Sequence, residues 1–239
     1  MKEFVFSQNW WQFLIVAVVC YFVGCINFAL IISRKKHNDI TKIGSGNPGT
    51  MKMSREFGLK VGLLTFLCDV LKGGIPAFVV WLLYKDFVFA GTNFLVVDFV
   101  RFLGGLFVVI GHIFPVTMKF KGGKGIASTV GLFWVSLTIE NPWWALIALC
   151  GVFGVAGIIL ITEWGSFASL TGITALGIAQ SVFLVLRYSG TAVNAYMVCS
   201  FLVILSIVTL DWAAHHKNLV RLFAGEEHKT SLKKIAKKK

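Results

Sequence analysis

Charged side chains are scarce in this chain of 239 residues. Aspartate, glutamate, lysine and arginine make up 14% of it, hydrophobic residues make up 56%, and the mean hydropathy is +0.78. A water-soluble domain needs far more charge on its surface. The scarcity of charge therefore argues against a soluble protein and favours one that crosses the membrane several times.

Paired cysteines and a cleavable leader are also missing. The five cysteines lie inside apolar runs without a CxxC pair, which favours small hydrophobic side chains over disulfides or metal ligands. The first apolar run follows Glu3 and precedes no small-x-small cleavage site, so we predict a membrane span there. The absence of an internal repeat argues against a transporter built of inverted halves.

Long apolar stretches recur along the whole chain. A bilayer core of about 30 Å is crossed by a helix of roughly 20 apolar residues. The stretches predict an all-α integral membrane protein with a single domain, 1–239, and a basic tail from about residue 223. We count seven transmembrane helices, or six if the short fourth stretch only dips into the membrane. The stretches are residues 10–32, 61–84, 94–112, 125–140, 143–162, 167–187 and 191–212.

Lysine and arginine fall unevenly on the two sides of a seven-span chain. Residues 33–60, 113–125 and the tail from 211 hold seven, three and eight of them on one side, whereas the other side holds four. The positive-inside rule then predicts an outside N-terminus and a cytoplasmic C-terminus. The net charge of +12 indicates attraction to the cytoplasmic leaflet or to anionic substrates, and not to nucleic acid.

The polar stretch GSGNPGTMKMSR, after the first span, has the composition of a phosphate-binding loop. Glycines bring backbone N–H groups close to a ligand, short polar side chains add donors, and an arginine fork suits phosphate. An ordinary cytoplasmic turn uses the same residue types. The candidate ligands are Ser45, Gly46, Asn47, Gly49 and Arg55.

A second polar cluster, GHIFPVTMKFKGGKGIAST, joins the third and fourth spans. His112 closes one span, and Lys121, Gly122, Gly123 and Lys124 open the next. Glycines beside a lysine at a helix start predict an anion site, although the spacing is not that of a Walker A loop. Anchoring at the membrane surface explains the lysines but not the glycines between them.

The third cluster, HHKNLVRL, follows the last span. His215, Asn218 and Arg221 share one helix face. A solvated juxtamembrane helix is the alternative. Adjacent histidines point to different faces, so we predict no metal site there.

Two charge pairs lie at i, i+3 inside or beside the spans. Asp69 and Lys72 in the second span predict either a structural ion pair or a substrate contact. Asp98 and Arg101, on the outer side, are assigned a structural role only. Ser166, in the loop EWGS on the cytoplasmic side, joins the site or belongs to a plain loop.

These motifs resemble the bacterial acyl-phosphate-dependent glycerol-3-phosphate acyltransferase (PlsY) family. The resemblance rests on GSGNPG with a following arginine, DVLKG, GHIFPV with FKGGKGIA, and HHKNLVRL, in order over nearly the whole chain. Two positions depart from the family pattern: Lys52 stands where asparagine is expected, and a serine pair is reduced to Gly165-Ser166. By resemblance the family's site positions are Ser45, Asn47, Arg55, Lys124, His215 and Asn218, with Ser166 near the second serine.

The resemblance implies a seven-span enzyme of the bacterial plasma membrane with its site on the cytoplasmic side. Such an enzyme moves a fatty acyl group from acyl phosphate to the 1-hydroxyl of glycerol 3-phosphate. The products are lysophosphatidate and phosphate, in the first step of phospholipid synthesis, and no cofactor is needed. The expected partners are both substrates, membrane lipid and a soluble enzyme that makes acyl phosphate.

We assign the roles from these motifs. Direct transfer without an acyl-enzyme is expected, because the chain has no G-x-S-x-G elbow and no cysteine beside a histidine. The His-x4-Asp pair of other acyltransferases is absent too. Two alternatives stay open: a transporter of an organic or phosphorylated anion, and a divergent paralogue with another acceptor. Catalysis is assigned to His215, Asn218, Ser45 and Asn47, substrate binding to Arg55, Lys124, Gly46, Gly49, Gly122, Gly123, Ser166 and Lys72, and support to Asp69, His112, Lys121 and Arg221.

Overall fold

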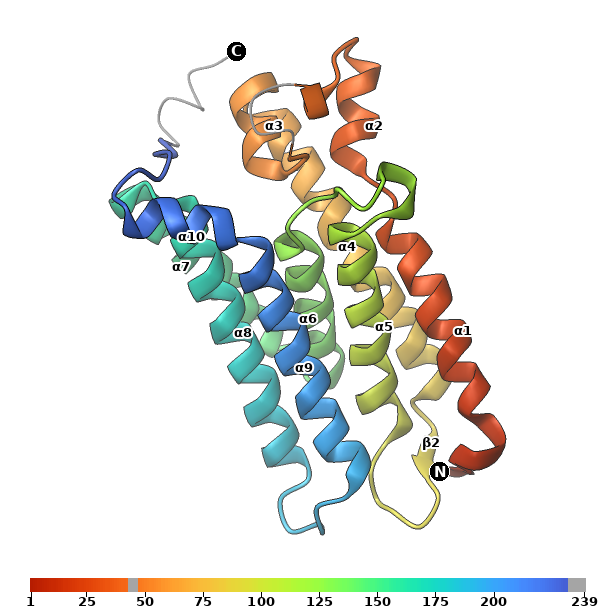
Figure 1. The fold of residues 1–239 in the computed structure, drawn as a ribbon. Coiled ribbons are helices and arrows are strands. Elements are labelled where there is room, and N and C mark those ends of the chain that lie inside the picture. The colour runs from red at the N-terminus through yellow and green to blue at the C-terminus, as the bar shows by residue number, and fades with distance from the viewer. Residues whose placement is uncertain (43–46, 232–239) are drawn as a thin grey trace.

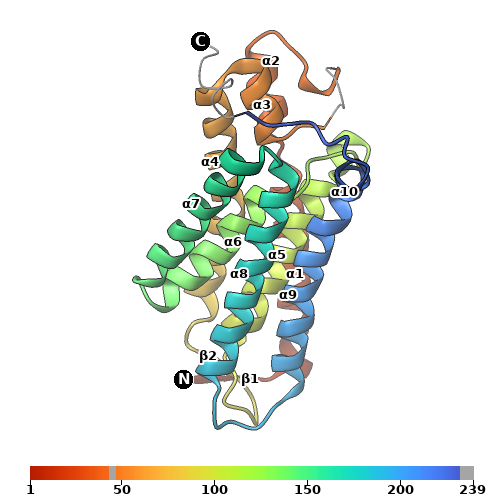
Figure 2. The same cartoon turned by 90° about the vertical axis from the view of Figure 1, so that its left-hand side faces the viewer.

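A computed structural model gives the fold and describes residues 1–42 and 47–231. The described chain is nearly all helical, which confirms the predicted class, and the long helices run side by side (Figures 1 and 2). Their ends lie within about four residues of the predicted stretches, apart from the first. The long helices are α1 (Phe6–Gly24), α4 (Leu59–Tyr84), α5 (Val96–Ile113), α6 (Ile126–Glu140), α7 (Trp144–Thr162), α8 (Gly165–Arg187) and α9 (Ala195–Ala214).

Six helical segments of the described chain are long and apolar enough to cross a membrane, with Phe6–Lys35 taken as one. Helix α6 is shorter, with 15 residues or about 22 Å. Its last residue, Glu140, nevertheless reaches the end of the bundle near the N-terminus, where it pairs with Arg101 at 2.5 Å. The count of seven crossings stays a prediction.

The first predicted span, residues 10–32, is not one continuous helix. Helix α1 ends at Gly24, and α2 (Phe28–Lys35) begins after Asn27, whose side chain accepts a hydrogen bond from the Leu30 N–H at 2.8 Å. The backbone of Gly24 lies against α5 so closely that a β-carbon would come within 2.2 Å of the Val108 carbonyl oxygen. This close packing and the Asn27 cap set the break, which the apolar composition does not reveal.

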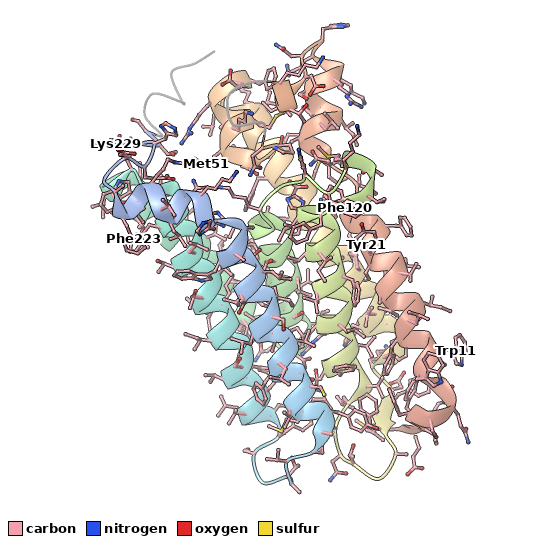
Figure 3. The ribbon with its side chains drawn as sticks, in the orientation of Figure 1. Trp11, Tyr21, Met51, Phe120, Phe223 and Lys229 are labelled. Atoms are coloured by element: carbon pink, nitrogen blue, oxygen red, sulfur yellow. The ribbon has the colours of Figure 1, made fainter. Side chains whose placement is uncertain are left out.

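The two ends of the bundle differ in character. One end carries the N-terminus, with β1 (Lys2–Phe4) paired in parallel with β2 (Phe87–Phe89), two short strands that the sequence did not predict. The other end carries α2, α3 (Thr50–Phe57), α10 (His216–Phe223) and two 3₁₀ turns, Ile40–Lys42 and Val116–Met118. Trp11 lies near the first end and Phe120 at the second (Figure 3). The described parts of the three basic segments therefore meet at one end of the bundle.

A network of largely buried ion pairs lies at the end of the bundle near the N-terminus. Arg101 pairs with Asp98 at 2.7 Å and with Glu140, and Arg187 pairs with both acids. Tyr188 donates a hydrogen bond to the Asp98 carboxylate. The predicted Asp98–Arg101 pair is confirmed, and the network joins α5, α6 and α8 far from the basic end.

Candidate active site

A cleft of about 670 Å³ opens at the basic end of the bundle. It lies between α3, the start of α6, the start of α8, α10 and the tail that follows α10. The three polar clusters of the sequence contribute to it, although they are far apart along the chain. The sequence-predicted residues that line it are Asn47, Gly49, Arg55, Asp69, His112, Lys124, Ser166, His215, Asn218 and Arg221.

The start of α6 presents Lys124 to this cleft. Gly125, with φ of +91°, turns the chain into the helix, and a β-carbon there would lie 2.1 Å from a carboxylate oxygen of Asp211. The Lys124 ammonium donates to the Asn218 side-chain oxygen at 2.5 Å. Gly125 and Ile126 also line the cleft, so the positive end of the α6 dipole faces it. Charge and dipole both favour an anion at this point, and the anion site itself stays a prediction.

Burial controls the charge of Lys124. Desolvation lowers the pKa of its ammonium to about 8, against the opposing effect of the Glu227 carboxylate and with the help of Arg221 and Arg55. The ammonium therefore remains mostly charged at neutral pH and loses its proton in the mildly alkaline range.

His215 lies between α9 and α10 and is buried. Its Nδ1 lies 2.7 Å from the Asp211 carbonyl oxygen, and because a carbonyl only accepts, Nδ1 carries the hydrogen. Burial and the neighbouring Lys124 lower the pKa of His215 to about 4, so the ring is neutral at pH 7. A neutral ring with hydrogen on Nδ1 leaves the Nε2 lone pair able to accept a proton.

Glu227, in the tail after α10, organises the polar wall, and sequence reasoning missed it. Its carboxylate accepts hydrogen bonds from Ser166 Oγ at 2.6 Å, Asn218 Nδ2 at 2.8 Å and Arg221 Nε at 3.3 Å. Partial burial raises its pKa, but those hydrogen bonds and the Arg221 charge outweigh it and lower the pKa overall. A signal did exist, because Glu226 and Glu227 are the only acidic residues after Asp211 in a basic tail.

The same tail also secures Arg55 of α3. The guanidinium donates to the hydroxyl of Thr230, which is buried and whose N–H donates to the Glu163 carbonyl at 2.7 Å. A β-carbon on Gly165 would lie 3.4 Å from the Thr230 hydroxyl. A threonine hydroxyl from the tail thus lies beside the position where the family pattern has its first serine. The tail is therefore part of the polar wall of the cleft.

The backbone of Gly122 and Gly123 does not face the cleft, contrary to the sequence-based assignment. Their N–H groups donate to the carbonyls of Ile113 and His112, each at 3.0 Å. These carbonyls end α5 and have no partner inside the helix, so the loop folds back to satisfy them. A β-carbon on Gly123 would lie 2.1 Å from His112 Nε2. These glycines serve close packing, and Lys121 with Gly122 lines a separate cavity.

Lys72 is not among the described residues that line the cleft, although two of its partners are. Its ammonium lies 3.2 Å from Asp69, 2.7 Å from His112 Nδ1 and 2.8 Å from the Ile26 carbonyl oxygen, with the Gly24 carbonyl at 3.3 Å. The predicted ion pair with Asp69 is confirmed. The carbonyls left open by the break after α1, together with Asp69 and His112, surround the ammonium, so the contacts favour the structural alternative over a substrate contact.

Two predicted positions and one departure from the family pattern remain. Ser45 and Gly46 lie outside the described residues. Lys52, at the position of the expected asparagine, lines the cleft and donates to the Ile40 carbonyl at 2.8 Å. Among the described residues, no three histidine, cysteine, aspartate or glutamate side chains gather in a metal-binding cluster.

Known proteins match this chain over nearly its whole length. A family model described as glycerol-3-phosphate acyltransferase matches residues 14–225. The glycerol-3-phosphate acyltransferase of Pseudothermotoga lettingae is 31% identical over 231 residues, which cover 95% of this chain and 99% of that protein. The Aquifex aeolicus protein of the same name is 34% identical over 217 residues, covering 90% of this chain and 98% of its own.

Two solved structures are also similar to this chain. The crystal structure of PlsY (YgiH), an integral membrane glycerol 3-phosphate acyltransferase, in its glycerol 3-phosphate form has a TM-score of 0.73 at 29% identity and covers 95% of this chain and all of that one. Its lysophosphatidic acid form has a TM-score of 0.70. Family model, relatives and fold agree, and the chain belongs to the glycerol-3-phosphate acyltransferase family of integral membrane proteins.

Proposed function

We propose that this protein transfers a fatty acyl group from acyl phosphate to the 1-hydroxyl of glycerol 3-phosphate. The observation that carries the proposal is the dual character of the cleft. Its polar wall combines Lys124, Arg55 and Asn218, whereas its other wall is apolar. A phosphorylated, water-soluble acceptor and a fatty acyl donor need this combination at the membrane surface. The apolar lining consists of Phe66, Val130, Val152, Val155, Ile159, Ile173 and Leu176.

Direct transfer fits the groups in the cleft. The acceptor oxygen forms a bond to the acyl carbon, and the bond from that carbon to the phosphate oxygen breaks. Acyl phosphate is already activated, so positioning supplies much of the rate, up to roughly 7–11 kcal/mol in favourable cases. The hydroxyl proton goes to Nε2 of the neutral His215 or to the leaving phosphate. Lysophosphatidate and phosphate are the products.

The cations in the cleft hold the phosphates in this mechanism. Lys124 and Arg55 bind phosphate oxygens by charge-assisted hydrogen bonds, each worth about 1.5–3 kcal/mol. The exposed N–H groups at the start of α6 stabilise negative charge on the acyl oxygen as it develops. Asn47 and Asn218 orient the acceptor. Ser45, in the same loop as Asn47, is proposed as a further ligand.

The transporter alternative finds less support. Lys124, Asn47 and His215 line one cleft at one end of the bundle. Polar loops at both ends would favour a transporter instead. Helix α4 also runs unbroken past Pro76, whereas transporter sites are typically formed by interrupted spans. A paralogue with a different acceptor remains the second candidate, because Lys52 and Gly165 depart from the family pattern in the cleft lining.

The proposal includes a location. We place the protein in the bacterial plasma membrane as one domain of seven spans, with the cleft on the cytoplasmic side and the N-terminus outside. The basic end would then face the compartment that supplies glycerol 3-phosphate and a soluble enzyme producing acyl phosphate.

An acyl-transfer assay on the purified protein tests this function. Labelled glycerol 3-phosphate is supplied with acyl phosphate, acyl-CoA or acyl carrier protein in separate reactions. We expect labelled lysophosphatidate from acyl phosphate alone. Product from acyl-CoA but not acyl phosphate would overturn the donor assignment, and product only with another phosphorylated alcohol would favour the paralogue.

Direct transfer has its own test. Enzyme incubated with labelled acyl phosphate alone should carry no label after denaturation, and initial rates should give intersecting double-reciprocal lines. An acyl adduct on Ser166 that glycerol 3-phosphate chases into product would refute the single-step route.

A further inference from the structure

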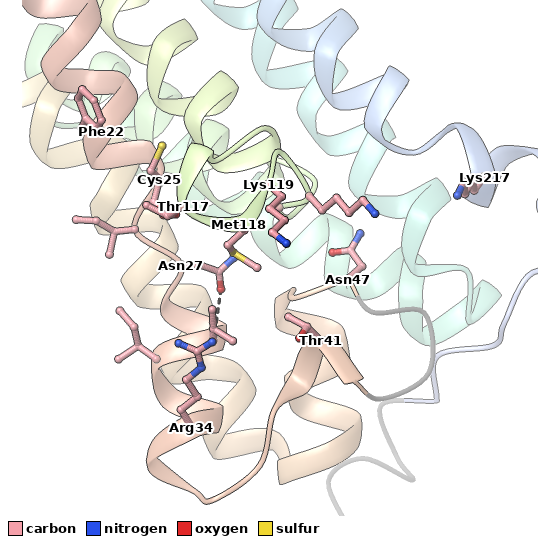
Figure 4. A pocket seen from close by; sticks show the side chains of 15 residues that line it. Phe22, Cys25, Asn27, Arg34, Thr41, Asn47, Thr117, Met118, Lys119 and Lys217 are labelled. Atoms are coloured by element: carbon pink, nitrogen blue, oxygen red, sulfur yellow. Dashed lines mark hydrogen bonds between the residues drawn. The ribbon is translucent and has the colours of Figure 1, made fainter.

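A second cavity, of about 1000 Å³, lies beside the cleft at the basic end. It is formed by the break between α1 and α2 and by the loop between α5 and α6 (Figure 4). It shares only Asn47 and Lys217 with the described lining of the cleft. Nothing in the proposed reaction uses its other residues, so it is a separate candidate site.

The cavity has a cationic rim. Arg34, Lys119, Lys121 and Lys217 contribute to its lining, and no acidic side chain is among the described lining residues. Lys119 and Asn47 face each other across it, with Arg34 on the α2 side (Figure 4). The cations come from three separate segments of the chain. Their convergence on one cavity selects for an anionic ligand.

A carboxylate close to Arg34, that of Asp39, already accepts two hydrogen bonds. Asp39 lies close enough for Arg34 to lower its pKa, after the larger effect of hydrogen bonds from Thr41. Its carboxylate accepts from the Thr41 N–H at 2.9 Å and from the Thr41 hydroxyl at 2.6 Å. Arg34 therefore retains donors that can reach a ligand in the cavity.

The other wall of the cavity is apolar and faces the membrane. Phe22 on α1, Ile26 in the break and Ile31 on α2 belong to its lining and are 56%, 43% and 43% exposed. They continue the outer face of the Phe6–Lys35 segment, which lipid chains cover in a bilayer. A free anion would gain nothing from this wall, whereas an amphiphile with a phosphate head would contact both sides.

The loop that carries two of the cations has a preformed shape. Lys119 and Phe120 both adopt left-handed backbone conformations, with φ of +52° and +60°, which are uncommon for residues other than glycine. The Pro115 carbonyl accepts hydrogen bonds from the Met118 and Phe120 N–H groups at 3.0 and 2.9 Å. Strain of this kind persists where surrounding contacts enforce it, often at binding sites.

Contacts with α1 fix this loop in place. The Tyr21 hydroxyl of α1 donates to the carbonyl of Phe114, at the start of the loop, at 3.0 Å. Phe120 is 59% exposed at the level where α1 gives way to α2, a position typical of aromatic rings at a membrane–water interface. The loop thus holds its lysines over the cavity while its aromatic ring meets the lipid.

We propose that this cavity binds an anionic phospholipid of the surrounding bilayer. The lipid phosphate lies among Arg34, Lys119 and Lys121, and one acyl chain follows Phe22 and Ile26 along the outer face of α1. The lipid is a resident ligand beside the cleft and takes no part in acyl transfer.

Lipid retention measured by native mass spectrometry tests this site. Protein from nanodiscs of equal phosphatidylglycerol and phosphatidylcholine should keep phosphatidylglycerol in preference by about tenfold, as expected for several cations near one phosphate. The combined variant R34Q/K119Q/K121Q should lose this preference. The matched control K35Q/K36Q/K42Q removes three exposed cations that do not line the cavity, and it should keep the preference.

Equal loss in the control variant would overturn the proposal in favour of bulk attraction to the membrane. Equal retention of phosphatidylcholine by wild type would overturn it too, as would retention of added lysophosphatidate in place of phosphatidylglycerol. If the combined variant fails to fold, wild type answers the question with a photoreactive phosphatidylglycerol. Cross-links should fall on residues 113–121 and on α1–α2, whereas cross-links spread evenly onto the exposed surface of α7 would refute a defined site.

Discussion

Activity should fall in mildly alkaline solution because Lys124 loses its proton there. Burial lowers the pKa of this ammonium to about 8, and the charged form is the one that binds phosphate. Glycerol 3-phosphate, as a phosphate monoester with a second pKa of about 6, is already doubly ionised above pH 7. The alkaline limb of kcat/KM should therefore report the lysine in the free enzyme.

The size of the effect follows from the pKa. With a value of about 8, roughly nine-tenths of Lys124 is charged at pH 7 and about one-tenth at pH 9, so kcat/KM for glycerol 3-phosphate should fall about tenfold between them. The Glu227 carboxylate raises this pKa, so Glu227→Gln should move the limb to lower pH. Lys124→Arg should flatten it, because a guanidinium stays charged beyond pH 12.

The assay is kcat/KM for glycerol 3-phosphate from pH 6.5 to about 9.5 at saturating acyl phosphate, the upper limit being one unit or more beyond the expected pKa. Lys121→Arg is the matched control from the same loop, outside the cleft, and should keep the wild-type limb. A wild-type profile that stays flat to the upper limit would refute the reasoning. So would a limb that persists unchanged in Lys124→Arg, because another group would then titrate.

Three other perturbations test the tail, the outer network and the orientation. Glu227→Ala removes charge-assisted bonds worth about 1.5–3 kcal/mol each, so trypsin should cut the tail much faster, and Glu226→Ala should not change the rate. Arg101→Met takes one of two arginine partners from the Asp98 and Glu140 carboxylates, which should cost up to about 3–5 kcal/mol, and an unchanged unfolding midpoint in detergent would contradict this. In a cysteine-free background, a cysteine at Phe120 should resist an impermeant thiol reagent on intact cells, whereas one at Ser7 should react; reversed labelling would put the cleft outside.

The sequence was sufficient for the helices that cross the bundle. The predicted stretch 94–112 corresponds to α5, Val96–Ile113, and the predicted stretch 143–162 corresponds to α7, Trp144–Thr162. A span must satisfy its backbone hydrogen bonds internally and be apolar over a fixed length, which are local properties of the chain. Pro115 follows the end of α5 and Gly125 precedes the start of α6. Both are local signals, because proline cannot continue a helix and glycine adopts a positive φ easily.

The sequence also predicted that the three polar clusters lie close together, because each follows a span that ends at the same end of the bundle. Lys124, Asn218 and His215 share one cleft, as the order of the spans requires. The alternation of spans decides on which side a loop emerges, but not which of its atoms face a ligand. That limit explains Gly122 and Gly123, whose N–H groups complete the end of α5.

Tertiary structure alone decided the features that depend on partners far along the chain. Apolar residues continue on both sides of Gly24, and besides the local Asn27 cap the break after α1 depends on α5 packing against Gly24 and on Lys72 binding the freed carbonyl. Glu227 belongs to none of the sequence motifs, yet its carboxylate accepts from Ser166 and Asn218 of two other elements. A carboxylate gains its role from the donors that surround it, and no local pattern encodes donors brought together by folding.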